Sequence, residues 1–320
     1  MRKISFVLKS MCICVFFALP FSICAETTAD SDDDGAYPDR KLSLDEIAKE
    51  LSNPVTALRS FAFDAEYRTF QGTLPGASDK TSMIYVLRPS FPIPLSNGKN
   101  ILLRARIPIN RDQPVWGLPI DHPSWKVDVD YSEFRIRQSP EITPEAGGFL
   151  PSHDHLDDIS FDVAYGGVSD NGFISMYGIV TVLPVSQDIS ASRDQWLLGP
   201  EVAFGKSADW GVAGAWLTHL TDITGGNEIS TNETTMKVFF AYGLGNGWQI
   251  ISNPRISYDW EAVSGEELSL PIGGGFAKTT RFGHMPFKME FEIHHYVVSA
   301  DRLAPDWLFT FNFTPVFGNP

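Results

Sequence analysis

Apolar and polar residues alternate along most of the chain from residue 58 onward. Gly, Asn, Asp, Ser and Pro separate the alternating segments, which is the pattern of β-strands with one apolar face. The pattern predicts strands at 58–70, 81–95, 99–109, 156–166, 173–184, 197–205, 208–221, 232–243, 247–260, 267–280, 286–299 and 306–317. These are twelve strands, and an even number is what a closed barrel with both termini on one side requires.

The predicted connections alternate in length. Every second link is short: 96–98, 167–172, 206–207, 244–246 and 281–285. The other links are mostly longer and more polar, and the longest is 110–155. Short turns at one end and long loops at the other are typical of outer-membrane barrels. A soluble β-sandwich has no reason to sort its loops in this way.

The two faces of the strands differ strongly in chemistry. In the last strand, Trp307, Phe309, Phe311 and Phe313 share one face. Between Trp248 and Trp260, aromatic residues lie at both ends of an apolar face, as in the aromatic girdles of membrane barrels. Such faces need lipid or a protein core. We expect an all-β, transmembrane, antiparallel up-and-down β-barrel of about twelve strands; the alternative is a sandwich whose apolar faces pack together.

The N-terminal region carries different patterns. Residues 1–25 have the charged start and apolar run of a secretory signal peptide. They hold all three cysteines, so the mature chain is expected to contain no disulfide. Residues 26–41 are acidic and typical of a disordered tail. In 42–57, Ser43 and Glu46 form a capping-box pattern, which predicts a short amphipathic helix that could plug the barrel. Residues 58–320 are the expected barrel.

The charge of the chain limits its partners. It has 25 basic and 39 acidic residues, and loss of Arg2, Lys3 and Lys9 with the signal peptide would leave 22 basic residues and a net charge of −17. Nucleic acid is therefore not an expected partner, because phosphate binding needs clustered Lys and Arg. The expected partners are outer-membrane lipid and a small solute. No cofactor is predicted, and the sequence leaves the oligomeric state open.

Several segments together resemble a known bacterial family. They are LDEIAKELSNPVTALRSFAFDAEY, RARIPI, DQWLLGPEVAF, YDWEA and the closing WLFTFNF. They are similar to the outer-membrane transporters named for a phenol-degradation pathway and often mislabelled as neuromedin U. The resemblance spans residue 44 to the C-terminus and implies a barrel that passes small hydrophobic or aromatic molecules. The chain departs from the family in its long loop 110–155 and in residues 318–320 after the terminal aromatic.

The strand phases predict which charged residues face the lumen. The predicted lumen-lining residues are Arg68, Arg88, Arg104, Arg106, Asp158, Asp162, Glu290, Glu292 and His294. The arginines come from the first three strands and the carboxylates from the fourth and eleventh. Opposed basic and acidic walls would create a transverse field that orients dipolar solutes. Alternatively, these groups pair across the lumen and fill it. An open pore and a plugged lumen are equally compatible with twelve strands.

Other candidate chemistry is less specific. His153 and His155 lie among aspartates and could bind a divalent ion, but their spacing matches no zinc signature. A lipid hydrolase could use His219 or His294 as a base, although no G-x-S-x-G or H-E-x-x-H motif is present. We therefore expect a non-enzymatic protein.

The favoured function is a passive channel for uptake of small hydrophobic or aromatic solutes across the outer membrane. Loop 110–155 would gate its outer mouth. Trp116, Trp125, Tyr131 and Phe134, together with Phe149, would line an apolar mouth or else anchor the loop itself. A structural or adhesive barrel without a pore is the alternative.

Overall fold

The structure, a computed structural model, describes residues 42–117, 147–150, 154–186, 195–224 and 230–317. The predicted signal peptide and acidic tail lie outside these ranges, as does most of loop 110–155. No helix in the described part of the chain is both long enough and apolar enough to span a membrane.

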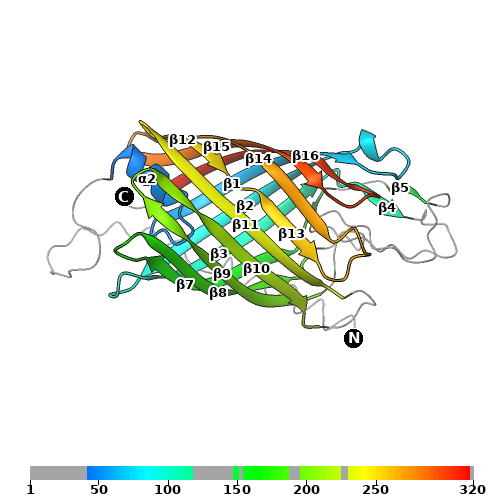
Figure 1. The fold of residues 1–320 in the computed structure, drawn as a ribbon, viewed down its shortest axis with the longest axis horizontal. Helices are drawn as coiled ribbons and strands as arrows, with labels where there is room; N and C mark the ends of the chain where they lie inside the picture. Colours follow the sequence, from blue (N-terminus) through cyan, green and yellow to red (C-terminus); the bar gives the residue numbers. More distant parts are fainter. Residues whose placement is uncertain (1–41, 118–146, 151–153, 187–194, 225–229, 318–320) are drawn as a thin grey trace. The chain divides into compact units, whose positions relative to one another are not determined.

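Long antiparallel strands form one closed sheet within the described residues (Figure 1). The sheet has twelve strand positions, which we call staves because two of them contain more than one strand segment. The strands are β1 (Arg59–Gln71), β2 (Thr81–Pro94), β3 (Asn100–Arg111), β7 (Ile159–Val168), β8 (Phe173–Leu183), β9 (Leu197–Ala208), β10 (Gly211–Asp222), β11 (Asn232–Gly245), β12 (Trp248–Ser252), β13 (Arg255–Asp259), β14 (Leu268–Phe282), β15 (Met285–Val298) and β16 (Ala304–Phe317). β12 and β13 are one stave interrupted at residues 253–254, and the short β6 (His155–Leu156) extends the stave of β7. The predicted barrel and its strands are confirmed.

The barrel closes by pairing the first and last strands. Arg59 lies opposite Phe317, and the ladder continues to Gln71 opposite Ala304, with one bulge. Every other neighbouring pair of staves is also antiparallel, including β10 with β11. The backbone groups of a closed barrel are satisfied between strands and leave no open edge, which is the condition for crossing a hydrocarbon layer.

The connections sort by length as predicted. Links 95–99, 169–172, 209–210, 246–247 and 283–284 lie at one end, which we call the short-turn end. Asn246 and Gly247 there have φ of 55° and 78°, a left-handed pair that favours Asn and Gly and matches the twist of a tight hairpin. The opposite, long-loop end carries the helical turn η1 (Ala77–Asp79) and the hairpin of β4 (Val115–Gly117) with β5 (Gly148–Leu150).

The outer surface of the barrel is apolar. Large side chains that face outward are unusually exposed, such as Tyr177 at 61% and Phe276 at 58%. Aromatic residues gather near both ends: Trp248 and Tyr242 toward the short turns, and Trp260 toward the long loops. Polar residues are buried inside instead. Water would disfavour so much exposed apolar area, so this surface is suited to lipid.

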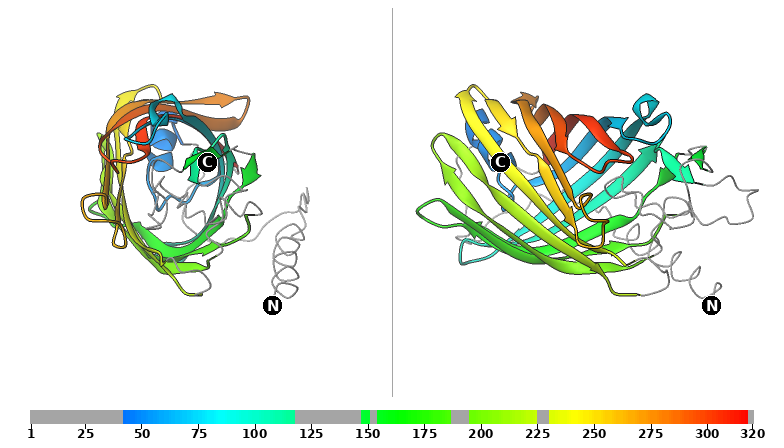
Figure 2. Two further views of the ribbon diagram at one scale, coloured as in Figure 1. Left: turned by 90° about the vertical axis from the view of Figure 1, so that its right-hand side faces the viewer. Right: turned by 45° about the vertical axis from the view of Figure 1, so that its right-hand side comes forward.

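One helix, α2 (Leu44–Leu51), precedes the barrel strands and lies within the ring of strands (Figure 2). Its predicted capping box is present: the Ser43 hydroxyl accepts from the Glu46 N–H, and the Glu46 carboxylate accepts from the Ser43 N–H. The Asp45 carboxylate accepts from the Gly247 N–H at 2.5 Å, which ties the helix to a short turn. Helix formation here thus follows from local sequence, and its position follows from contacts to the barrel.

The short-turn end of the lumen is filled by apolar side chains. We call this filling the floor: α2, residues 52–58 and the buried residues packed on them. Ile47 of α2 packs with Leu58 and Val316, and all three are at most 8% exposed. Val55 belongs to one buried apolar cluster with inward-facing residues of eight staves; these are Leu102, Ala164, Ile174, Met176, Ala203, Val212, Phe239, Ala241, Ile251 and Ala277.

Candidate functional site: a charged cavity in the lumen

A cavity of about 520 Å³ lies in the lumen above the floor. Its base includes residues 51–54 and Thr56, and its walls come from staves all around the barrel. The structure places all nine predicted lumen-lining residues around it: Arg68, Arg88, Arg104, Arg106, Asp158, Asp162, Glu290, Glu292 and His294. The alternation of the strands therefore brings these residues together at one site.

Arg104 is the most highly connected of the charged residues in the cavity. Its guanidinium binds Asp162 at 2.6 Å and Glu201 at 3.0 Å, and these side chains are 12%, 15% and 2% exposed. It also lies 4.1 Å from the ring centre of Trp216, whose indole N–H donates to Glu201. A further bond to the Pro54 carbonyl joins this wall to the floor. Arg104 is thus a structural cross-link.

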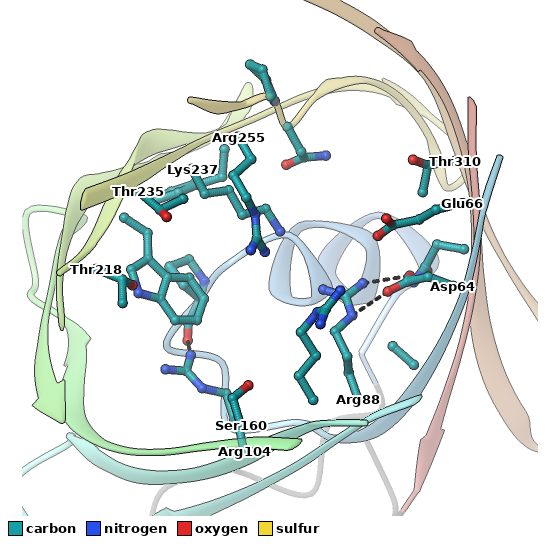
Figure 3. A pocket seen from close by; sticks show the side chains of 18 of the residues that line it. Asp64, Glu66, Arg88, Arg104, Ser160, Thr218, Thr235, Lys237, Arg255 and Thr310 are labelled. Carbon is teal, nitrogen blue, oxygen red and sulfur yellow. Dashed lines mark hydrogen bonds and ion pairs between the residues drawn. The ribbon is translucent and has the colours of Figure 1, made fainter. Parts of the chain in front are cut away.

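Two further ion pairs form within one strand or between adjacent strands. Arg88 of β2 binds Asp64 of β1 at 2.6 Å, and Asn312 of β16 donates to the same carboxylate. Arg68 and Glu66 are two residues apart on β1 and pair at 2.7 Å. Figure 3 shows the Arg88–Asp64 pair in the cavity wall. Such local pairs lower the electrostatic cost of placing charges in a confined lumen.

The wall formed by β15 contains a second group of polar contacts. Lys288 binds Glu290 at 2.7 Å and donates to Ser52 Oγ in the floor. The Glu292 carboxylate accepts from both the backbone N–H and the side-chain amide of Asn253 at 2.8 Å. Asn253 stands where β12 and β13 are interrupted, so Glu292 stabilises the break in that stave.

The charges are therefore mixed around the lumen rather than separated into opposed walls. The first two strands carry Asp64 and Glu66 beside their arginines, and Glu290 lies beside Lys288. The pairs form along the wall, between residues on one strand or on nearby strands. This arrangement differs from both expectations, a transverse field and pairing across the lumen. The difference arises because inward positions of adjacent strands are much closer than opposite walls.

Sequence reasoning missed several residues that line the cavity. Asp64, Glu66, Glu201 and Lys237 all line it, as does Arg255, whose inward direction follows from its strand phase. Asp64 and Glu66 share the phase of Arg68, so strict alternation from Arg68 was a usable signal. Glu201 and Lys237 stand in strands where many apolar residues occur on both faces, so their direction was less evident.

The predicted loop residues fall in two groups. Trp125, Tyr131 and Phe134 lie outside the described residues. Trp116 is buried in a cluster at the long-loop end with Phe70, Leu74, Ala77 and Leu303, and meets Phe149 edge to face at 4.9 Å. Trp116 thus anchors the β4–β5 hairpin.

The candidate metal ligands are not grouped in the described structure. His153 lies outside it, and His155 Nε2 lies 3.4 Å from the Asn110 amide. The described residues contain no group of three or more His, Cys, Asp or Glu side chains that could hold a metal ion.

The two candidate catalytic histidines lie on opposite faces of the barrel wall. His294 faces the cavity, with Nε2 at 3.5 Å from Glu292. His219 belongs to β10, where Trp216, Thr218 and Leu220 line the cavity, so alternation turns His219 outward. There its Nδ1 contacts the Thr234 hydroxyl at 2.9 Å. The two imidazoles cannot converge on one substrate.

The fold, the apolar outer surface and the polar lumen define a β-barrel of the outer-membrane type. No family model matches the chain, and no curated protein matches it. Solved structures of outer-membrane proteins resemble it in fold. The COG4313 outer membrane channel from Pseudomonas putida F1 has a TM-score of 0.54 at 8% identity, over 91% of this chain and 100% of that one.

Two further solved structures align less well. The beta domain of the Bordetella autotransporter Brka has a TM-score of 0.38 at 11% identity, over 82% of this chain and 100% of that one. The CymD monoaromatic hydrocarbon channel has a TM-score of 0.39 at 8% identity, over 86% of this chain and 91% of that one. The likeness to the Pseudomonas channel shows the shared barrel fold.

Proposed function

We propose that this protein is a passive channel that takes up small hydrophobic or aromatic solutes across the bacterial outer membrane. The observation that supports this most directly is the cavity of about 520 Å³ inside a closed barrel. Its size suits a small organic ligand. Its lining combines charged groups with apolar surface from Trp216, Leu220 and Leu308. The sequence resemblance to transporters named for a phenol-degradation pathway supports the same solute class.

A specific observation favours a second candidate, a structural barrel without a pore. The floor closes the short-turn end with side chains such as Ile174 and Val212, both 0% exposed. For transport, the floor must move when a solute passes. Its attachment by hydrogen bonds from Gly247 to Asp45 and from Lys288 to Ser52 is compatible with such movement, because polar contacts can exchange for water.

Planar-bilayer recording of the purified full chain separates the two candidates. A channel is expected to give discrete current steps. The Ile47→Ala variant, in which the packing of the floor is loosened, is expected to give larger steps. Heat-denatured protein in the same detergent is the control. Silence from both the parent and the loosened variant would favour the structural barrel.

A lipid hydrolase that uses His219 or His294 as its base is the least favoured proposal, because the sequence contains no G-x-S-x-G or H-E-x-x-H motif. Assay of the parent protein on phospholipid vesicles, with the H219A and H294A variants as controls, tests it. Release of fatty acid that either variant abolishes would support the enzyme.

A further inference from the structure

Three cations that line the cavity have no hydrogen-bonded or ion-paired partner in the described part of the chain. Arg106, Lys237 and Arg255 make no hydrogen bond or ion pair with any other described residue. The neighbouring cations differ: Arg68, Arg88, Arg104 and Lys288 each have a carboxylate within 3.0 Å. Most cations that face the lumen therefore have a carboxylate in direct contact. These three have none among the described residues, and Glu66 acts on Arg106 and Arg255 only at longer range.

Two of these three cations, Lys237 and Arg255, are neighbours on adjacent strands. Lys237 of β11 and Arg255 of β13 are directly opposite each other in the ladder, and both side chains point into the cavity (Figure 3). Like charges in that position destabilise a sheet. Arg106, on β3, is within electrostatic range of Arg255. Such an unfavourable pair of like charges is retained most readily where a bound anion neutralises it.

Neutral groups beside the cations complete the lining. Thr218 and Thr235 form a cross-strand pair two residues from Lys237, toward the long loops. Among the described residues, the Thr218 hydroxyl has no partner. Trp216 lies opposite Lys237 on the adjacent strand and offers aromatic surface. Two forked guanidinium groups and an ammonium group match a carboxylate, and the adjoining apolar surface matches a small organic body.

We propose that Arg106, Lys237 and Arg255 bind the carboxylate of a small organic acid, such as an aromatic monocarboxylate, within the lumen. The inference deepens the proposed channel function and rests on it, because it names the class of solute. The carboxylate bridges the three cations, and the hydroxyl of Thr218 donates a further hydrogen bond to it. The hydrocarbon part of the acid lies against Trp216.

Calorimetric titration of the purified full chain in detergent tests the site with sodium benzoate. We expect saturable binding, and binding about tenfold weaker or worse in the K237Q/R255Q double variant, since that variant loses charge-assisted hydrogen bonds to the carboxylate. The R255K variant, which keeps the charge, should lose less. The K99Q variant removes one charge from an exposed short turn and should bind as the parent does.

Neutral and cationic probes sharpen the test. Benzyl alcohol and benzylammonium have similar size and are expected to bind at least about tenfold more weakly than benzoate. The heat-dependent gel shift of intact barrels verifies that each variant folds. If the double variant does not fold, the single variant K237Q takes its place. The proposal is overturned if the parent binds no benzoate, if benzyl alcohol binds equally well, or if removal of the cations leaves benzoate binding unchanged.

Bilayer recording separates failure of this site from failure of the channel function. Benzoate binding with no current in any variant would preserve the anion site and count against transport. Current steps that benzoate neither blocks nor modulates, together with no calorimetric binding, would preserve the channel and reject the site.

Discussion

The floor and the cavity of this barrel are built on the inward faces of the same staves, yet their chemistry is opposite. In the floor, Ile174, Val212 and Ile251 are at most 1% exposed and belong to one buried cluster with Val55. In the cavity, inward faces of strands that also contribute to the floor carry Arg104, Glu201, Lys237 and other polar side chains. One region excludes water by packing, and the other keeps space for it.

The barrel wall alone therefore does not determine whether its lumen is open. The segment 52–58 enters the lumen only at the short-turn end, where inward residues have an apolar partner to bury against. Farther along the same strands no such partner is present among the described residues, and charged residues face the space. Filling apolar positions there would add stability but remove the cavity.

The largest effect is expected from breaking the link between the two regions. Arg104→Ala removes a guanidinium that pairs with Asp162 and Glu201 and contacts Pro54 in the floor. Two buried carboxylates would lose their counter-ion, so we expect destabilisation of about 3–5 kcal/mol. Urea titration in detergent, followed by the gel shift of the folded barrel, measures it. Arg104→Lys is the matched control and should lose less; equal stability of the alanine variant and the parent would contradict the cross-link.

A somewhat smaller effect is expected from loosening the floor itself. Ile47 is 0% exposed, and Ile47→Ala should weaken helix docking by about 2–5 kcal/mol. Because the helix packs inside the barrel rather than in its wall, the loss should appear as increased conductance before it appears as unfolding. Lys49→Ala on the same helix removes only a 3.5 Å contact and serves as control. If the two variants conducted equally, the helix would not be the barrier.

Most of the wall could be predicted from the sequence, because alternation and turn residues are local signals. The strand limits, the short turns and the capping box of Ser43 and Glu46 all follow from neighbours in the chain. The direction of Arg104 or Glu292 follows from the same period. Their partners could not be predicted, because Glu201 reaches Arg104 from 97 residues away.

The division of the lumen into floor and cavity was also not evident from the sequence. Leu102 and Arg104 share one face of β3, so alternation gives them the same direction. Only the position of Val55, fixed by the Asn100 amide and by Arg104, determines which of them packs and which meets the cavity. Likewise, the break at Asn253 and Pro254 divides a strand that the alternation of apolar and polar residues predicts to be continuous.

A pH effect on the floor is expected from Glu50 of α2. Burial raises the pKa of this carboxyl above 4.5, and a hydrogen bond from Thr56 partly offsets the increase. Since the folded state holds the proton more tightly than the unfolded state, docking weakens as pH rises from 4.5 through the raised pKa. Glu50→Gln should abolish this dependence of helix docking on pH. At the upper end of the pH range the variant should therefore conduct less than the parent. Conductance measured across this interval checks it; an identical slope in the variant would assign the pH effect to another group.

The smallest expected effect separates packing from polarity within the floor. Thr279 of β14 is 0% exposed, and its hydroxyl has no hydrogen-bond partner in the described structure. Thr279→Val keeps the shape and removes an unsatisfied buried group, so stability should stay unchanged or rise by up to about 1 kcal/mol. The same change at Thr218, in the cavity wall, should leave stability within about 0.5 kcal/mol, since water can reach that hydroxyl. Urea titration of both variants gives the comparison. A clear loss of stability in Thr279→Val would mean that a water or another group bonds this hydroxyl, and that the floor is less dry than its packing indicates.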